Sequence, residues 1–230
     1  MSTLRMDQPG PADARSLPIH ETATHAHHFR DRDHEFDAAK MGVWLFLATE
    51  VLLFSGLFMY YAVMRYLHPD AFRHGSSLLD WRWGLINTAV LLMSSFTAAA
   101  AVRDAQLGRQ GWLKVNLFLT GLAGLAFLVI KFVFEYYPKW LAGELPGKYY
   151  TYPNWESPNE PQWWGLYWAA TGVHATHVLI GILLYTWMFI RAFLGYYGPK
   201  RYMMVEGTAL YWHIVDIVWI FLFPMLYLIH

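Results

Sequence analysis

The chain of 230 residues contains no cysteine. This absence excludes disulfides, iron–sulfur clusters, thiolate zinc sites and cysteine nucleophiles. Charge is also scarce, because 15% of the residues are Asp, Glu, Lys or Arg, against about 25% in an ordinary soluble domain. The formal net charge is zero, so the sequence gives no electrostatic reason to expect nucleic acid as a partner.

The residues that are present are mostly apolar: 56% are hydrophobic and 18% are aromatic. Aromatic residues collect at the two water–lipid boundaries of membrane proteins. Five segments reach the roughly 20 residues that cross a hydrocarbon core, and lipid requires such segments to be helical. They are residues 41–66, 83–102, 112–136, 164–193 and 206–229. We therefore expect an all-α fold, a polytopic membrane bundle of five transmembrane helices.

Residues 1–39 are polar and contain few aliphatic side chains, so they cannot bury enough surface to offset their ordering entropy. We expect a flexible polar N-terminal tail over 1–39 and the membrane domain over 40–230. The tail has no apolar run of roughly 7–15 residues, and we expect no cleavable signal peptide. Its histidines are typical of a solvated arm rather than a metal site: His20, His25, His27, His28 and His34.

The basic residues predict the orientation, because cytoplasmic ends carry an excess of Lys and Arg. Eleven fall on the side of the N-terminus and five on the other side. We expect an integral multi-pass protein of a bacterial plasma membrane, with the N-terminus inside and the C-terminus outside.

An acid lies inside the first helix. Glu50 falls about 14 Å along it at 1.5 Å per residue, near the middle of the membrane, where a charge costs roughly 2.5–3.5 kcal/mol. The neighbouring sequence offers no positive partner. We interpret Glu50 as a proton-relay or regulatory carboxyl, with a neutral acid hydrogen-bonded to another helix as the alternative.

The last two helices carry a second group of polar residues. His174 and His177 share one helix face, and so do His213 and Asp216. Such pairs could bind a metal, ligate haem or form a hydrogen-bonded cluster that locks the helices together. We favour the cluster and expect no metal. Glu206 opens the last helix, where it would complement the helix dipole or bind a neighbour.

Lys131 and Glu135 lie four residues apart near the outer end of the third helix. We expect an interfacial ion pair in which Lys131 reaches towards water. Asn87 and Thr88 are candidates for interhelical hydrogen bonds. None of these patterns predicts a catalytic residue.

Taken together, these motifs resemble subunit III of the haem–copper oxidases, in the five-helix form of cytochrome c oxidase subunit 3. The resemblance covers about residues 40–230, with the helices in order. It lies in WLFLATE at 44–50, Asn87-Thr88, Ser94-Ser95, Glu135-Tyr136-Tyr137, TGVHATHV at 171–178, Glu206 and YWHIVDIVW at 211–219.

The resemblance implies a non-catalytic subunit of a proton-pumping terminal oxidase in aerobic electron transport. Such a subunit packs on catalytic subunit I, within a complex that also contains subunit II, and stabilises subunit I while supporting its proton uptake. It holds structural phospholipids in a V-shaped cleft and carries no cofactor of its own, since haem and copper belong to the partner subunits. The carbodiimide-reactive acid of such subunits falls on Glu50, the histidine pair on His174 and His177, and the acid of the last helix on Glu206.

The sequence departs from many family members by lacking their first two helices, one arm of the V, so another chain would complete the cleft. Glu50 and Glu206 favour cytochrome c as the electron donor. A quinol oxidase subunit III, suggested by the histidines of 24–28, and an accessory subunit of a nitric oxide reductase stay open. Different classes are a stand-alone membrane haem or metal protein using His174, His177 and His213, and a transporter, which the absence of inverted repeats disfavours.

Overall fold

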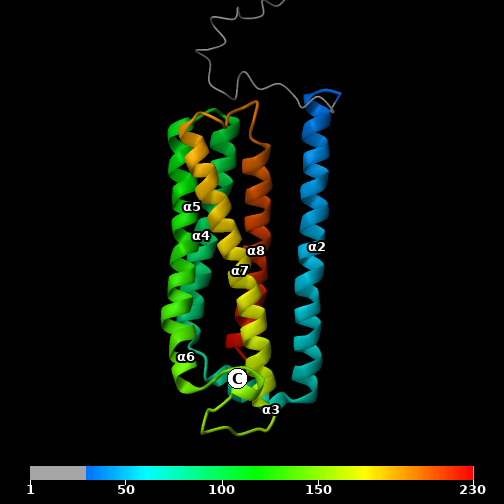
Figure 1. Ribbon diagram of the computed structural model, residues 1–230, viewed down its shortest axis with the longest axis vertical. Helices are drawn as coiled ribbons and strands as arrows, with labels where there is room; N and C mark the ends of the chain where they lie inside the picture. Colours follow the sequence, from blue (N-terminus) through cyan, green and yellow to red (C-terminus); the bar gives the residue numbers. More distant parts are fainter. Residues whose placement is uncertain (1–29, 230) are drawn as a thin grey trace, which may run out of the picture.

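A computed structural model describes residues 30–229 (Figure 1). Within this range the chain is helical, and its one strand-like feature is an isolated bridge between Gly198 and Arg201. Most of the predicted tail, with His20, His25, His27 and His28, lies outside the described residues.

Five stretches of helix in the described part are long and apolar enough to cross a membrane. The predicted all-α membrane bundle is therefore confirmed, and the protein is an integral multi-pass membrane protein. The stretches are α2 (Arg32–Leu67), α4 (Trp81–Gln106), α5 (Gln110–Ile130) with π-helix η2 (Lys131–Tyr136) and α6 (Tyr137–Ala142), α7 (Glu160–Phe193) and α8 (Met203–Tyr227). The short helices are α3 (Pro69–Ser77) and the 3₁₀ turn η3 (Gly147–Tyr149).

The five long helices each begin before their predicted apolar segments. α2 begins at Arg32, where the Asp31 carboxylate accepts a hydrogen bond of 2.8 Å from the backbone nitrogen of His34. Residues 32–39 of the segment predicted as a tail are therefore helical. A capping acid can start a helix without apolar residues, so a prediction from hydrophobic length misses this turn.

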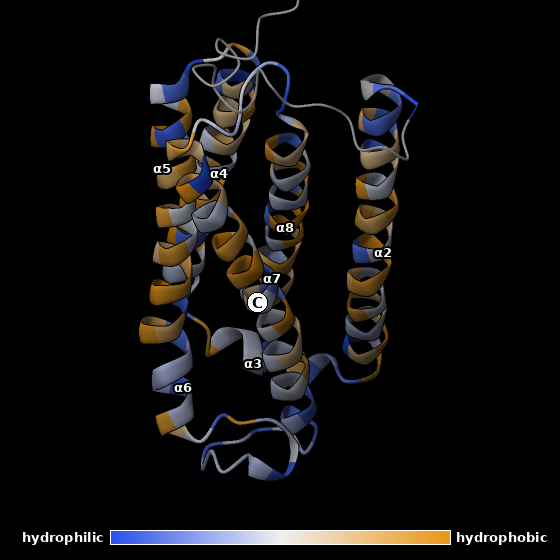
Figure 2. Ribbon diagram, turned by 45° about the horizontal axis from the view of Figure 1, so that its top comes forward, coloured by the Kyte–Doolittle hydropathy of each residue, from blue (hydrophilic) through white to orange (hydrophobic). Residues whose placement is uncertain are grey.

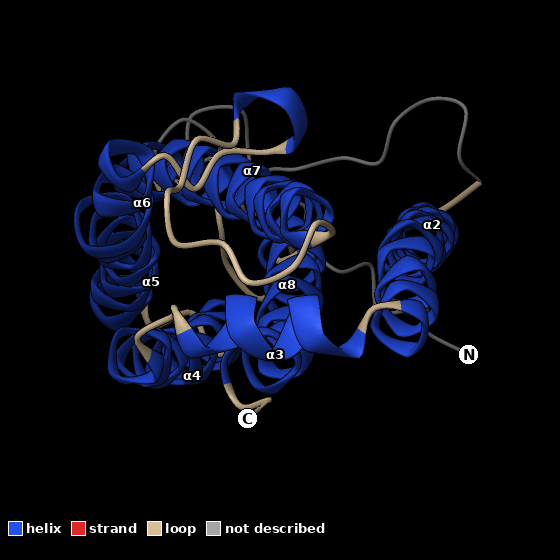
Figure 3. Cartoon of the chain, turned by 90° about the horizontal axis from the view of Figure 1, so that it is seen from below, coloured by secondary structure: helices blue, strands red, loops and turns tan. Residues whose placement is uncertain are grey.

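The long helices pack unequally. α4, α5, α7 and α8 form a compact bundle, while α2 stands at its edge and touches α3, α7 and α8 (Figures 1 and 3). The bundle core is built on four fully buried indoles, those of Trp163, Trp164, Trp212 and Trp219. Hydrophobic residues also run along the whole length of the long helices (Figure 2). Apolar surface outside the bundle is what a lipid environment requires.

Small residues let Trp212 enter the centre of the bundle. A Cβ atom at Gly124 of α5 would lie 2.7 Å from the Trp212 ring, and one at Gly181 of α7 would overlap the same ring. The indole nitrogen donates to the Ser94 hydroxyl of α4 at 2.9 Å. One side chain of α8 thus fixes three neighbouring helices.

Candidate functional site

The acid predicted to be functional has a partner from another helix. The Oε2 atom of Glu50 lies 2.7 Å from Nε2 of His177, and the two side chains are 14% and 13% exposed. The other ring nitrogen of His177, Nδ1, lies 2.7 Å from the carbonyl of Val173. A carbonyl only accepts, so Nδ1 carries a proton, and Glu50 and Nε2 share one further proton between them.

Aromatic side chains surround this pair and join three helices. The rings of Phe54 and His177 are 5.1 Å apart, and the Tyr211 hydroxyl of α8 donates to the His177 carbonyl at 2.9 Å. Phe46 of α2 packs on Tyr211 with ring centroids 6.0 Å apart. The sequence around Glu50 gives no sign of this partner, because it lies 127 residues further along the chain.

A cavity of about 560 Å³ opens between α2, α7 and α8, on the side of the pair nearer the start of α2. Its walls include Val43 of α2 and Leu184 of α7, whereas Arg191 and Arg201 lie at its polar end. Both guanidinium groups stack on Tyr196, with their central carbons 4.0 and 3.9 Å from the ring centroid. The cavity therefore combines apolar walls with two fixed cations.

Glu206 lies in the first turn of α8, as expected for an acid that complements the helix dipole. It also has a neighbour, because its Oε1 atom is 3.4 Å from the ammonium group of Lys40 on α2. Glu206 therefore has a bound neighbour, and its role toward the helix dipole stays a prediction. The pair ties the start of α8 to α2.

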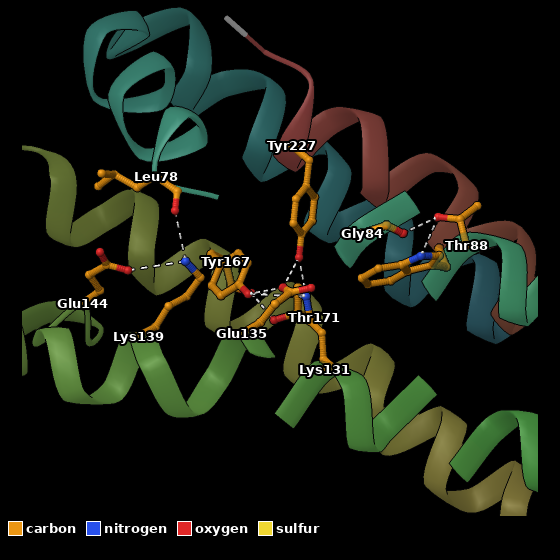
Figure 4. A network of polar contacts seen from close by, with 11 residues as sticks. Leu78, Gly84, Thr88, Lys131, Glu135, Lys139, Glu144, Tyr167, Thr171 and Tyr227 are labelled. Carbon is orange, nitrogen blue, oxygen red and sulfur yellow. Dashed lines mark hydrogen bonds and ion pairs between the residues drawn. The ribbon is translucent and has the colours of Figure 1, made fainter. Parts of the chain in front are cut away.

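The prediction for Lys131 and Glu135 was wrong in one respect, since Lys131 does not reach water. The two side chains are 1% and 2% exposed and are joined at 2.5 Å (Figure 4). Lys131 also donates to the Tyr227 hydroxyl at 2.5 Å, and Tyr167 donates to Glu135 Oε2 at 2.9 Å. The stretch continues through η2 to Ala142, so Lys131 lies further from its end than the apolar pattern indicated. The π turn places both charged groups on the inner face.

A second set of buried charges, which the sequence did not reveal, lies nearer the loop between α6 and α7. The Lys139 ammonium is 3.5 Å from Glu144 (Figure 4). Burial raises the pKa of Glu144, and the charge of Lys139 opposes this rise.

Glu160 organises the same loop. Its fully buried carboxylate accepts hydrogen bonds from the Tyr150 hydroxyl at 2.6 Å and from the backbone nitrogens of Glu156 and Ser157 at 2.6 and 2.9 Å. His74 Nδ1 of α3 lies 2.9 Å from the same carboxylate. The sequence carries one sign of this site, the acid Glu160 at the end of the loop. That residue lies outside the apolar segments on which the prediction was based.

The predicted cluster of the last two helices does not form as one unit. Its members His177 and Glu206 pair with α2, as described above. His213 Nδ1 lies 2.9 Å from the Ser95 hydroxyl of α4, and the same hydroxyl donates to Asp216. Among the described residues no three His, Asp or Glu side chains converge as metal ligands would.

His174 lies apart from the other members. It is fully buried against Phe127 and Trp219, with ring centroids 5.4 and 5.1 Å away. Neither of its ring nitrogens has a hydrogen-bond partner within residues 30–229. Its surroundings are therefore those of a packed core histidine.

Asn87 and Thr88 differ in their contacts. The Thr88 hydroxyl accepts a hydrogen bond from the Trp219 indole of α8 at 3.1 Å and donates to the Gly84 carbonyl at 2.8 Å. Asn87 is fully buried, and its amide has no partner in the described part of the chain. Only Thr88 therefore forms the interhelical bond expected of the two.

The sequence is similar to known oxidase subunits. A family model described as "Cytochrome c oxidase subunit III" matches residues 158–230. A "Heme-copper oxidase subunit I+III" of Aeropyrum pernix is 30% identical over 201 residues, which are 84% of this chain and 23% of that larger protein.

Two relatives of similar length are each named "Probable quinol oxidase subunit 3". The protein from Staphylococcus epidermidis is 27% identical and that from Staphylococcus aureus 28%, each over 203 residues, which are 86% of this chain and 92% of the relative. The chain belongs to the subunit III family of the haem–copper oxidases.

Proposed function

We propose that this chain is the non-catalytic subunit III of a proton-pumping terminal oxidase, in a complex with subunits I and II. It would stabilise the catalytic subunit I and support its proton uptake, while haem and copper would be held by the partner subunits. The observation that carries this proposal is the contact between Glu50 and His177. Ionisable groups inside a membrane commonly form proton relays, and this pair holds one exchangeable proton near the middle of α2.

The cavity beside α2 fits a structural phospholipid. Its apolar walls suit acyl chains, and Arg191 and Arg201 suit an anionic headgroup. Because α2 packs weakly on the bundle, lipid in this cavity would fill the space between them. Bound phospholipid is therefore part of the proposal.

We infer cytochrome c as the electron donor of the complex. The description of the matching family model, together with Glu50 and Glu206, supports this donor. Quinol is the second candidate, because the staphylococcal relatives are named as quinol oxidase subunits. Turnover of the purified complex with reduced cytochrome c and with a short-chain quinol separates the two.

The proposal is tested by purifying the complex through a tag on this chain in mild detergent. We expect haem absorption bands on a larger partner and none on this chain after dissociation. A chain that purifies alone with its own haem or metal overturns the proposal.

The role of Glu50 is tested in the same complex. We expect Glu50→Ala to slow turnover under conditions in which proton uptake is limiting. The matched control is Thr49→Ala, because the Thr49 hydroxyl only bonds to the Phe46 carbonyl of its own helix. Equal turnover of the Glu50 variant and the control would remove Glu50 from proton uptake.

A further inference from the structure

Three polar residues lie together at the α4–α8 seam, the line along which these two helices meet at the outside of the bundle. Ser95 of α4 contacts both His213 and Asp216 of α8. Asp216 is 2% exposed, and its Oδ1 atom is fully buried without a hydrogen-bond partner among residues 30–229. His213 is only half-buried. It therefore lies where a buried polar group meets the outside of the bundle.

The hydrogen bonds of this group leave one ring nitrogen of His213 unused. Nδ1 is engaged by Ser95. Nε2 has no partner in the described part of the chain, and it is not among the fully buried atoms. The single hydroxyl proton of Ser95 is donated to Asp216, so Nδ1 carries the ring proton and donates to Ser95, and Nε2 is left as an acceptor. An acceptor at the surface of the bundle therefore lacks a donor.

The depth of His213 means that water and lipid headgroups cannot supply that partner. His213 follows the first residue of α8, Met203, by ten positions (203 to 213), or about 15 Å along the helix axis. That is half of the roughly 30 Å hydrocarbon core. Acyl chains offer neither donors nor acceptors, so an unpaired polar group at this depth is costly.

The surroundings of His213 match a helix-docking surface. One and two turns further along the same face, Ile217 and Ile220 are 50% and 40% exposed. On the other side of the seam, Leu92 and Phe96 of α4 are 51% and 71% exposed next to Ser95. The surface is thus an apolar stripe with one polar point, the pattern by which membrane helices combine packing with an interhelical hydrogen bond.

We propose that the α4–α8 seam binds a transmembrane helix of a partner subunit that presents a hydroxyl or carboxamide side chain to Nε2 of His213. Such a side chain supplies the donor that the Nε2 acceptor lacks. The inference rests on the proposed function only in that the chain works inside an oxidase complex. It adds which face of the chain meets the partner and through which atom.

The test is photocrosslinking in cells that assemble the complete complex. Benzoylphenylalanine replaces Ile217 at the seam, and in separate controls Phe118 of α5 or Leu183 of α7, which are similarly exposed on other faces. We expect Ile217 to give a protein adduct whose crosslinked peptide lies in a partner transmembrane segment with Ser, Thr, Asn or Gln. The controls should not label that segment.

Variants of His213 test the hydrogen bond itself. His213→Leu should lower the Ile217 adduct about three-fold or more, the effect of losing one interhelical hydrogen bond. His213→Gln keeps a carboxamide at the site and should retain most of the adduct. An unchanged yield with leucine overturns the role of His213.

The remaining outcomes separate the two proposals. If Ile217 labels only lipid or a second copy of this chain while a haem-containing partner still purifies with the tag, the docking inference is wrong and the proposed function stands. If no haem-containing partner purifies with the unmodified chain, the proposed function itself fails. Wild-type crosslinking from Ile217 decides the question even if the His213 variants do not fold.

Discussion

Glu50 and Glu135 are both intramembrane acids, yet their partners differ. Glu50 shares one proton with His177 at the edge of the bundle. Glu135 lies in the core, held by Lys131, Tyr167 and Tyr227. An acid with one partner can exchange its proton, whereas an acid with three partners is fixed in place. The two residues should therefore respond differently to substitution.

Removing one charge of the buried ion pair between Lys131 and Glu135 should strongly destabilise the protein. Lys131→Met leaves Glu135 uncompensated in a space that is closed to water. We expect a loss of about 3–5 kcal/mol, the usual cost of a lone buried charge. Thermal denaturation of the purified protein in mild detergent measures the effect.

The double variant Lys131→Met, Glu135→Leu is the control. It removes both charges, so its loss should be smaller than that of either single variant. Equal losses for the single and double variants would mean that the side chains matter through packing and not through their charges.

A conservative substitution of Glu50, the acid at the edge of the bundle, should have a mild effect. Glu50→Gln keeps a hydrogen-bonding side chain 2.7 Å from the His177 imidazole, so we expect the complex to assemble in normal yield. Co-purification of the partner subunits, compared with Glu135→Gln, measures this. Loss of assembly in Glu50→Gln alone would give Glu50 an architectural role instead of a regulatory one.

Residue patterns predicted which positions are unusual better than they predicted their partners. Glu50 and His213 stand out because charge and imidazole are costly in an apolar run. Their partners His177 and Ser95 come from distant helices. The spacing of residues along one helix shows which of them share a face, but it does not show which residue of another helix lies opposite. For this reason the predicted cluster proved to be several separate contacts.

At the scale of elements, the Trp212 side chain packs α8 against α5 and α7, because Gly124 and Gly181 have no side chain in its way. We predict that Gly181→Ala destabilises the protein by about 1–3 kcal/mol, because the added methyl group overlaps a fully buried ring. Gly121→Ala is the matched control, since its Cβ atom would lie 3.7 Å from Tyr185, an ordinary contact distance. Thermal denaturation of both variants gives the comparison, and equal stability would show that the indole can move aside.

The existence of the five long helices follows from sequence, but their ends do not. Hydrophobic length reports the part of a helix that lies in lipid. The first turns of α2 and α7 are instead made by polar residues such as Asp31 and Glu160. The π turn over Lys131–Tyr136 is only six residues long, and a periodic hydrophobic pattern does not resolve so local a change of the helical repeat.

At the scale of the whole molecule, we propose that the loop between α6 and α7 faces outward and the turn between α4 and α5 inward. The lack of cysteine makes this easy to test, because any introduced thiol is unique. Tyr149→Cys and Leu107→Cys place thiols at exposed positions of these two segments. In spheroplasts, a membrane-impermeant maleimide should label only the first, and labelling of only the second would reverse the orientation.

The separation of 127 residues between Glu50 and His177 also determines how long after Glu50 its partner is synthesised. At roughly 5–20 residues per second, the ribosome makes His177 about 6–25 s after Glu50. Partners of α2 on α8, among them Glu206, Tyr211 and Met225, follow later still. During this interval the first described helix must reside in the membrane with its acid unmatched. The apolar residues of α2 must therefore drive its insertion into the membrane without help from the rest of the bundle, which has not yet been synthesised.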